Sequence, residues 1–285
     1  MGAPGTNPDG ISDFSICNLK IEILMTPVPE IKIFPDRAAL TRDAARRFVA
    51  RARKAIDARG RFAVALYGGT TPRDLYALLA SPEFSAQVDW SRVHIFFGDE
   101  RAVPPDHADS NFKMANAVLL ARVSLPAQNV HRIRAELGAD DAAREYEKEL
   151  REFFAREGNR GNKGNEGSEG NNFPRLDLIL LGLGANGHTA SLFPHTRVLR
   201  ETTRWVAAEF IDEVKMARIT LTAPMINAAR NILWLVAGAD KTATVRAVLR
   251  GDYRPDDLPA QLIAPRDARV VWLIDRDAAR EITTN

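Results

Sequence analysis

Short apolar runs alternate with stretches of helical periodicity along most of this chain. The apolar runs lie at 61–67, 92–98, 176–182, 231–238 and 269–275. The helical patterns lie at 72–80, 108–121, 139–156, 223–229 and 240–250. Strands of continuous apolar residues must be buried on both faces, so this alternation predicts an α/β fold with a mostly parallel sheet, helices on both faces and open Rossmann-like layers. Ligands in such folds bind beyond the carboxyl ends of the strands.

An earlier helix carries clear start and stop signals. Asp36 can cap it, and Gly60 stands just past its end. Apolar side chains recur on one of its faces, at Leu40, Ala44, Phe48, Ala52 and Ile56. A strand-like EIKIF at 30–34 precedes it.

The domain organisation follows from two segments of unusual composition. Residues 1–28 are rich in Gly, Pro and Asn, and we expect a mobile extension whose CNLKIEILM could pair at a sheet edge. GNRGNKGNEGSEGNN at 158–172 has glycine at every third position, as collagen does, but no proline to sustain a triple helix. We expect a disordered insertion there, within a single domain at 29–285.

Composition excludes several classes of protein. The 39 basic and 37 acidic residues give a formal charge of +2, which predicts no nucleic-acid partner. The single cysteine, Cys17, excludes an intramolecular disulfide and a multi-cysteine metal site. No charge-free stretch reaches the length of about 18 apolar residues that a membrane span needs, and the N-terminus does not resemble a signal peptide. We therefore expect a cytoplasmic protein without a membrane partner.

The stretch YGGTTPRDLY follows the first of the five apolar runs. Gly68 and Gly69 would let the backbone approach a ligand, and Thr70 and Thr71 carry hydroxyl groups. Pro72 suits the first turn of a helix. Free amides at a helix N-terminus bind anions, so this turn could hold a phosphate; a plain strand-to-helix turn is the alternative. The stretch is neither a Walker loop nor a G-x-G-x-x-G fingerprint.

Three charged residues end the second run, at Asp99, Glu100 and Arg101. Charge at a buried strand end is costly unless it has a partner or a role. A capping salt bridge is the alternative, but the crowding of three charges where ligands bind favours a functional site. We expect Asp109 or Ser110 to cap the helix that follows.

The third run leads into LGLGANGHTASLFP. Asn186 and Gly187 supply a turn, and His188 would face the same crevice as Asp99. The ordinary pKa of histidine lies near neutrality and suits a general base, although a turn histidine is the alternative. A nearby serine could suggest a hydrolase, but the G-x-S-x-G elbow is absent, so we interpret Ser191 as a helix residue.

Two further basic residues could complete an anion site. Arg218 begins the strand-like RITLT, and Lys241 lies in GADKTA directly after an apolar run. Each alone could be a surface charge; with Arg101 they could neutralise a phosphate of about −1.5 to −2. The sequence indicates no metal and no cofactor, since His188 and His195 lack the i, i+4 spacing of a zinc pair.

Five motifs together resemble the motif set of the 6-phosphogluconolactonases, within the glucosamine-6-phosphate isomerase/6-phosphogluconolactonase family. They are, in the family's order, YGGTTPRDLY, FFGDERAVPPDHADSNFKMA, LDLILLGLGANGHTASLFP, RITLT and GADKTATV. The resemblance covers residues 30–275. It implies the α/β fold shared with glucosamine-6-phosphate deaminase. It also implies metal-independent hydrolysis of 6-phospho-D-glucono-1,5-lactone to 6-phosphogluconate, in the oxidative pentose phosphate pathway. The family usually carries aspartate, as DGHTASLFP, where this chain has Asn186.

The chemistry of lactone hydrolysis gives each candidate a role. We predict that His188 acts as general base toward water and that Asp99 orders the substrate or the imidazole. Backbone amides of the glycine-rich turns would stabilise the oxyanion. The residues expected to bind phosphate or substrate are Gly68, Gly69, Thr70, Thr71, Arg101, Asn186, Gly187, Arg218 and Lys241. The expected partner is a small phosphosugar lactone, and the expected assembly is a monomer or homodimer.

Three alternatives stay open at this point. An isomerase or deaminase acting on glucosamine 6-phosphate would need a further carboxylate base, and only Asp99 and Glu100 are candidates. A noncatalytic sugar-phosphate-binding regulator would explain Asn186, but the chain carries no recognisable output module. A scaffold role would leave the polar strand ends unexplained.

Overall fold

The computed structural model describes residues 28–158 and 173–283. Apart from their boundary residues, Val28 and Gly158, the expected extension at 1–28 and the expected insertion at 158–172 lie outside these residues, and so does CNLKIEILM.

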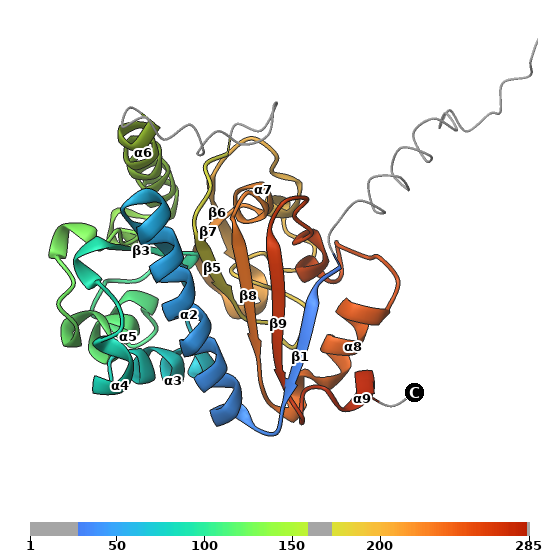
Figure 1. Cartoon of the computed structure of the whole chain (residues 1–285). Coiled ribbons are helices and arrows are strands. Elements are labelled where there is room, and N and C mark those ends of the chain that lie inside the picture. The colour runs from blue at the N-terminus through green and yellow to red at the C-terminus, as the bar shows by residue number, and fades with distance from the viewer. Residues whose placement is uncertain (1–27, 159–172, 284–285) are drawn as a thin grey trace, which may run out of the picture.

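A six-stranded parallel sheet forms the centre of the molecule, in the order β1-β9-β8-β5-β2-β3 (Figure 1). Its strands are β1 Glu30–Phe34, β2 Phe62–Leu66, β3 Val93–Phe97, β5 Leu178–Leu181, β8 Asn231–Val236 and β9 Arg269–Asp275. Every residue of β2 and β5 is buried, as continuous apolar strands require. The five apolar runs and EIKIF are therefore strands as predicted, and the α/β fold class is confirmed.

Helices flank this sheet, and α2 crosses one of its faces, in contact with β1, β2, β8 and β9 (Figure 1). The helices are α2 Arg37–Arg59, α3 Thr70–Leu79, α4 Pro82–Ser85, α5 Asn111–Val118, α6 Ala139–Gly158, α7 Ala223–Asn227, α8 Thr242–Arg250 and α9 Arg280–Thr283. None of the helices within 28–158 and 173–283 combines the length and apolar character needed to cross a membrane.

The start and end of α2 agree with the sequence prediction. The Asp36 carboxylate accepts a hydrogen bond from the Ala39 amide at 2.8 Å, and Gly60 ends the helix with a left-handed φ of 75°. The predicted apolar face is buried at Leu40, Ala44, Phe48 and Ala52. Ile56 on the same face is partly buried and packs against the hydrophobic core.

A second sheet, antiparallel and three-stranded, was not predicted. It has the order β4-β7-β6, with β4 Asp99–Arg101, β6 Val206–Ile211 and β7 Met216–Leu221. Gly98 joins the two sheets, because its amide donates to Leu66 at 2.8 Å while its carbonyl accepts from Leu221 at 2.8 Å. The charged residues that follow β3 therefore do not simply end a strand. They form a strand of the small sheet, beside the carboxyl end of the large one.

Candidate active site

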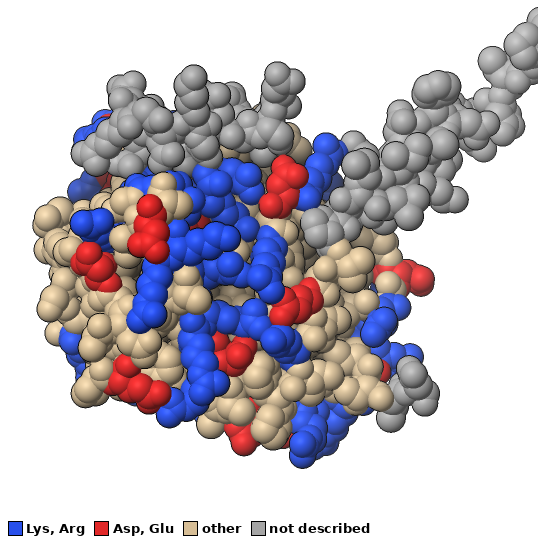
Figure 2. Space-filling model, viewed as in Figure 1, with Lys and Arg blue, Asp and Glu red and all other residues tan. Residues whose placement is uncertain are grey.

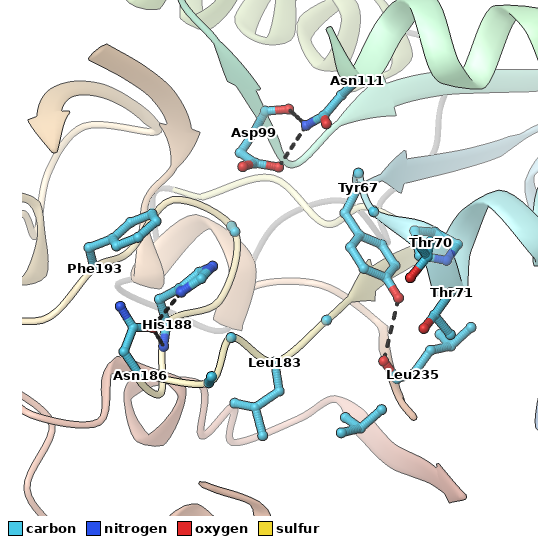
Figure 3. Close-up of a pocket in the computed structure, with 18 of the residues that line it drawn as sticks. Tyr67, Thr70, Thr71, Asp99, Asn111, Leu183, Asn186, His188, Phe193 and Leu235 are labelled. Atoms are coloured by element: carbon cyan, nitrogen blue, oxygen red, sulfur yellow. Dashed lines mark hydrogen bonds between the residues drawn. The ribbon is translucent and has the colours of Figure 1, made fainter. Parts of the chain in front are cut away.

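A pocket of about 480 Å³ lies beyond the carboxyl ends of β2, β5 and β8. The loops that follow these strands supply most of its wall, and β4 and β7 of the small sheet supply the rest. The predicted site residues that line it are Gly68, Gly69, Thr70, Thr71, Asp99, Arg101, Asn186, His188, Arg218 and Lys241. Figure 3 shows Asp99, Asn186 and His188 approaching the pocket from different sides. His188 lies across from Thr70 and Thr71.

Gly187 is the one predicted site residue that does not line the pocket. Its φ of 82° requires a turn that favours glycine, and a Cβ there would lie 2.7 Å from a methyl carbon of Leu258. Its carbonyl accepts a hydrogen bond from the Ala260 amide at 2.9 Å. The structure therefore gives this glycine a role in the turn and in packing behind the pocket.

His188 is held in one orientation by its neighbours (Figure 3). Its ring stacks on Phe193, with ring centroids 4.1 Å apart and planes 11° apart. Its Nδ1 lies 2.5 Å from Oδ1 of Asn186, and the amide nitrogen of Asn186 donates to Glu213 at 2.7 Å. The Glu213 carboxylate only accepts, so it fixes which way the amide faces. The amide oxygen also only accepts, so Nδ1 carries the proton and Nε2 keeps its lone pair.

The surroundings of His188 keep the imidazole neutral. Burial lowers its pKa to about 4, although the nearby carboxylates of Asp99 and Glu213 raise it. Lys241 and Arg218 lower the pKa further because they repel a second positive charge. The imidazole is thus neutral at neutral pH, and the lone pair of its Nε2 is available as a base.

The Asp99 carboxylate is buried and fixed by the side chains of Ser191 and Asn111, of which Figure 3 shows Asn111. Its Oδ2 accepts a hydrogen bond from the Ser191 hydroxyl at 2.7 Å. The Asn111 amide donates to its Oδ1 at 3.2 Å and to its backbone carbonyl at 2.9 Å. These bonds hold the carboxylate at the pocket wall, close enough to His188 to influence its pKa.

The prediction that Ser191 belongs to a helix is wrong. Thr189 and Leu192 form an isolated antiparallel bridge, and Ala190 has a positive φ of 46°, which a right-handed helix cannot contain. The turn between them places the Ser191 side chain inward, where it is fully buried against Asp99. Ser191 therefore positions Asp99.

The Glu100 side chain binds the first backbone amides of α5 and does not line the pocket. Its carboxylate accepts hydrogen bonds from the amides of Arg101, Asn111 and Phe112, each at 2.8 Å. Burial raises its pKa, which these three bonds oppose. The helix is also capped by Ser110, one of the two predicted candidates. Glu100 therefore caps α5 through backbone hydrogen bonds, and not through the salt bridge that was the alternative at this strand end.

Arg101 and Arg218 form a pair of like charges at the pocket wall. They are direct neighbours across β4 and β7, and both line the pocket. The Nε of each is buried without a hydrogen-bond partner among the described residues. Burial lowers the pKa of Arg218, and the charge of Arg101 adds to that effect. Two adjacent positive charges at the wall repel each other, so this pair favours an anion in the pocket.

The N-terminus of α3 faces the pocket with free backbone amides. Gly69 precedes the helix, and no side chain caps it. Thr70 and Thr71 begin the helix at the pocket wall. A Cβ on Gly68 would lie 1.8 Å from Oδ1 of Asn111, so only glycine fits there. This arrangement is a ready anion site.

Comparison with known proteins identifies the family. The model of the glucosamine-6-phosphate isomerases/6-phosphogluconolactonase family matches residues 35–272. The chain belongs to this family. A 6-phosphogluconolactonase of Synechocystis sp. is 37% identical over 255 residues, which cover 89% of this chain and 98% of the relative.

Solved structures agree with the family assignment. The 6-phosphogluconolactonase from Trypanosoma cruzi superposes with a TM-score of 0.78 at 28% identity, covering 90% of this chain and 97% of that one. A monomeric glucosamine-6-phosphate deaminase superposes with a TM-score of 0.72 over 88% of this chain and 99% of that one, and at 20% identity this likeness shows the fold alone.

Several residues of the pocket were not predicted from the sequence. Tyr67, Asn111, Phe193 and Glu213 line the pocket. Asn111 and Phe193 lie within stretches already noted, so proximity to those motifs was an available signal. Glu213 had none, because it lies in the connection between β6 and β7, and neither β6 nor its pairing with β7 was predicted.

Proposed function

We propose that this protein hydrolyses 6-phospho-D-glucono-1,5-lactone to 6-phosphogluconate, a step of the oxidative pentose phosphate pathway. Relatives named for this activity match nearly the whole chain. The observation that carries the proposal is the combination in one pocket of a neutral histidine and a pair of adjacent arginines. The histidine can activate water for attack on a lactone, and the arginines can bind a phosphate.

His188 is the general base of the proposed reaction. Its Nε2 takes a proton from water, and the oxygen of that water bonds to the lactone carbonyl carbon. The tetrahedral intermediate then expels the ring oxygen, which receives the proton back from Nε2. Backbone amides of the glycine-rich turns stabilise the oxyanion that forms between these steps.

Asn186 and Glu213 orient the base. The amide oxygen of Asn186 holds the proton on Nδ1, and the Glu213 carboxylate lies one hydrogen bond further away. This carboxylate and that of Asp99 stabilise the imidazolium at longer range than an aspartate at position 186 would. Neither the proton transfer nor the orientation of the ring requires aspartate at that position.

Arg101, Arg218 and Lys241 anchor the phosphate, together with the free amides of α3. The guanidinium groups of Arg101 and Arg218 would form charge-assisted hydrogen bonds with phosphate oxygens at the pocket wall. Anchoring at this end of the substrate places the lactone ring toward His188 across the pocket.

The deaminase alternative loses one of its two candidate bases. Glu100 is occupied by three backbone amides and does not line the pocket. Asp99 is present, but its carboxylate already accepts hydrogen bonds from Ser191 and Asn111. Lactone hydrolysis needs only the histidine as base.

The test is addition of the purified protein to freshly generated 6-phosphogluconolactone, with acid release followed against spontaneous hydrolysis. We expect saturable acceleration. Absence of acceleration by folded protein would refute the proposal; ammonia release from glucosamine 6-phosphate would instead support the deaminase. Binding of 6-phosphogluconate without turnover would support a regulator. We propose a cytoplasmic location and a phosphosugar lactone as the only partner that the reaction requires.

A further inference from the structure

A second pocket lies at the opposite edge of the large sheet, where β5, β8 and β9 begin. It has a volume of about 360 Å³. We call it the basic pocket; its lining residues are Arg51, Lys54, Ala55, Arg59, Arg175, Asp177, Arg230, Asn231 and Asp267. Figure 2 shows lysine and arginine side chains gathered over α2 and beside it. The basic pocket shares no residue with the candidate active site.

Asp177 is an internal structural partner for part of this charge. Its side chain is only 3% exposed and accepts hydrogen bonds from Arg59 at 2.5 Å and from the Ala63 amide at 2.8 Å. Arg230 lies 3.7 Å from the same carboxylate. Burial lowers the pKa of Arg230, and the charge of Arg59 adds to this effect. One buried carboxylate therefore faces two guanidinium groups.

Other cations of the basic pocket form no ion pair within the described part of the chain. The side chains of Arg51 and Lys54 make no hydrogen bond or ion pair with any residue in the described ranges. Arg175 donates to the backbone carbonyls of Ala228 at 3.2 Å and Asp267 at 3.3 Å. Burial lowers the pKa of Arg51, and the charges of Arg269 and Arg47 lower it further, although the Glu30 carboxylate raises it. Like charges crowded in a partly buried cavity repel one another, and an anion would relieve that repulsion.

The charge and size of the basic pocket indicate the class of ligand. Five basic and two acidic side chains give its wall a net charge of +3. A phosphate group carries about −1.5 to −2 at neutral pH, so two such groups match this charge and one does not. Guanidinium forks bind phosphate oxygens in pairs, and a cavity of this volume suits a small molecule. We propose that the basic pocket binds a small molecule carrying two phosphate groups, at a site separate from the candidate active site.

Inorganic pyrophosphate is the probe, measured by isothermal titration calorimetry on the full chain at fixed ionic strength. The substitutions Arg101→Gln and Arg218→Gln are present throughout, because they weaken anion binding in the candidate active site. We expect saturable binding of one pyrophosphate per chain in this background. Adding Arg51→Gln and Lys54→Gln should weaken it by about 10- to 100-fold.

The control removes the same charge from the same helix outside the basic pocket. Arg37→Gln with Arg46→Gln should leave pyrophosphate affinity unchanged, because both side chains are exposed and neither lines the pocket. Lys54→Gln alone also changes an exposed side chain and keeps the test decisive if the double variant is unstable. It should weaken binding measurably.

Four results would overturn the proposal. The first is absence of saturable binding, and the second is an equal loss of affinity in the control pair, which would indicate diffuse surface charge. The third is binding of inorganic phosphate as tightly as pyrophosphate, which would indicate a single-anion site. The fourth is tighter binding of a single-stranded oligonucleotide that the control pair weakens equally, which would indicate an extended nucleic-acid surface.

Discussion

His188 combines two properties that a base in this pocket needs. The stacked ring of Phe193 and the amide of Asn186 hold the imidazole in place, and burial keeps it neutral. We expect His188→Ala to lower kcat by about 10²- to 10⁴-fold with little change in KM, since the base acts on water and not on the bound phosphate. Steady-state kinetics, with circular dichroism as the folding control, checks this. Full kcat in the variant would make His188 a turn residue only.

One substitution that adds a carboxylate near His188 and one that removes a carboxylate should shift the loss of activity at low pH in opposite directions. The wild-type activity should fall as pH drops through about 4, where His188 becomes protonated. Asn186→Asp adds a negative charge beside Nδ1, raises the pKa and moves the loss of activity to higher pH. Glu213→Gln removes a charge that raises the pKa and should move it to lower pH.

The pKa of His188 in the Asn186→Asp and Glu213→Gln variants can also be measured without an activity assay. Nuclear magnetic resonance titration of the His188 ring should give the same order of pKa values, whatever reaction the protein performs. It should also show the proton on Nδ1 in the wild type. Unchanged pKa values in both variants would contradict the orientation of His188 by Asn186 and Glu213.

At the scale of elements, the small sheet decides the charge of the pocket. Pairing of β4 with β7 places Arg101 beside Arg218, and neither strand would deliver an anion site alone. We expect Arg218→Ala or Lys241→Ala to raise KM for the phosphorylated lactone by about 10- to 100-fold and to change kcat less, because substrate and transition state share this binding.

A matched control lies in the hairpin between β6 and β7. Lys215→Ala removes an exposed cation that pairs with Asp212 at 3.2 Å and does not line the pocket, so KM should not change. The unphosphorylated lactone should lose nothing in the Arg218 and Lys241 variants. A KM that rises equally for both lactones would remove these residues from the phosphate site.

At the scale of the whole molecule, we propose that residues 29–285 form one domain despite the composition of residues 158–172. Deletion of 159–171 should change neither Tm nor activity, since the segment has no apolar side chain to bury. Differential scanning calorimetry and the lactone assay check this. As a positive control, Leu150→Ala removes a fully buried side chain of α6 and should cost about 2–5 kcal/mol of stability. Failure of the deletion variant to fold would contradict the proposal.

Short-range sequence patterns determined the strands of the large sheet, the ends of α2 and the edge of the sheet at which the pocket lies. Continuous apolar runs indicated the strands of the large sheet, and Asp36 and Gly60 marked the ends of α2 because caps act within a few residues. The same alternation placed the motifs of His188 and Arg101 at one edge of the sheet, which is why most of the pocket residues were predicted. These features need no knowledge of distant contacts.

Long-range packing decided the rest. The three residues of β4 are too few and too charged to predict a strand from the sequence. They form a strand because they pair with β7. Ser191 faces Asp99 across 92 positions, and Glu213 meets Asn186 across 27, so neither role has a local signature. Glu100 caps α5 instead of facing the pocket because backbone amides of that helix surround it. The sequence determined which residues could do chemistry, whereas the tertiary structure decided which of them share a cavity, because that depends on contacts between segments far apart in the chain.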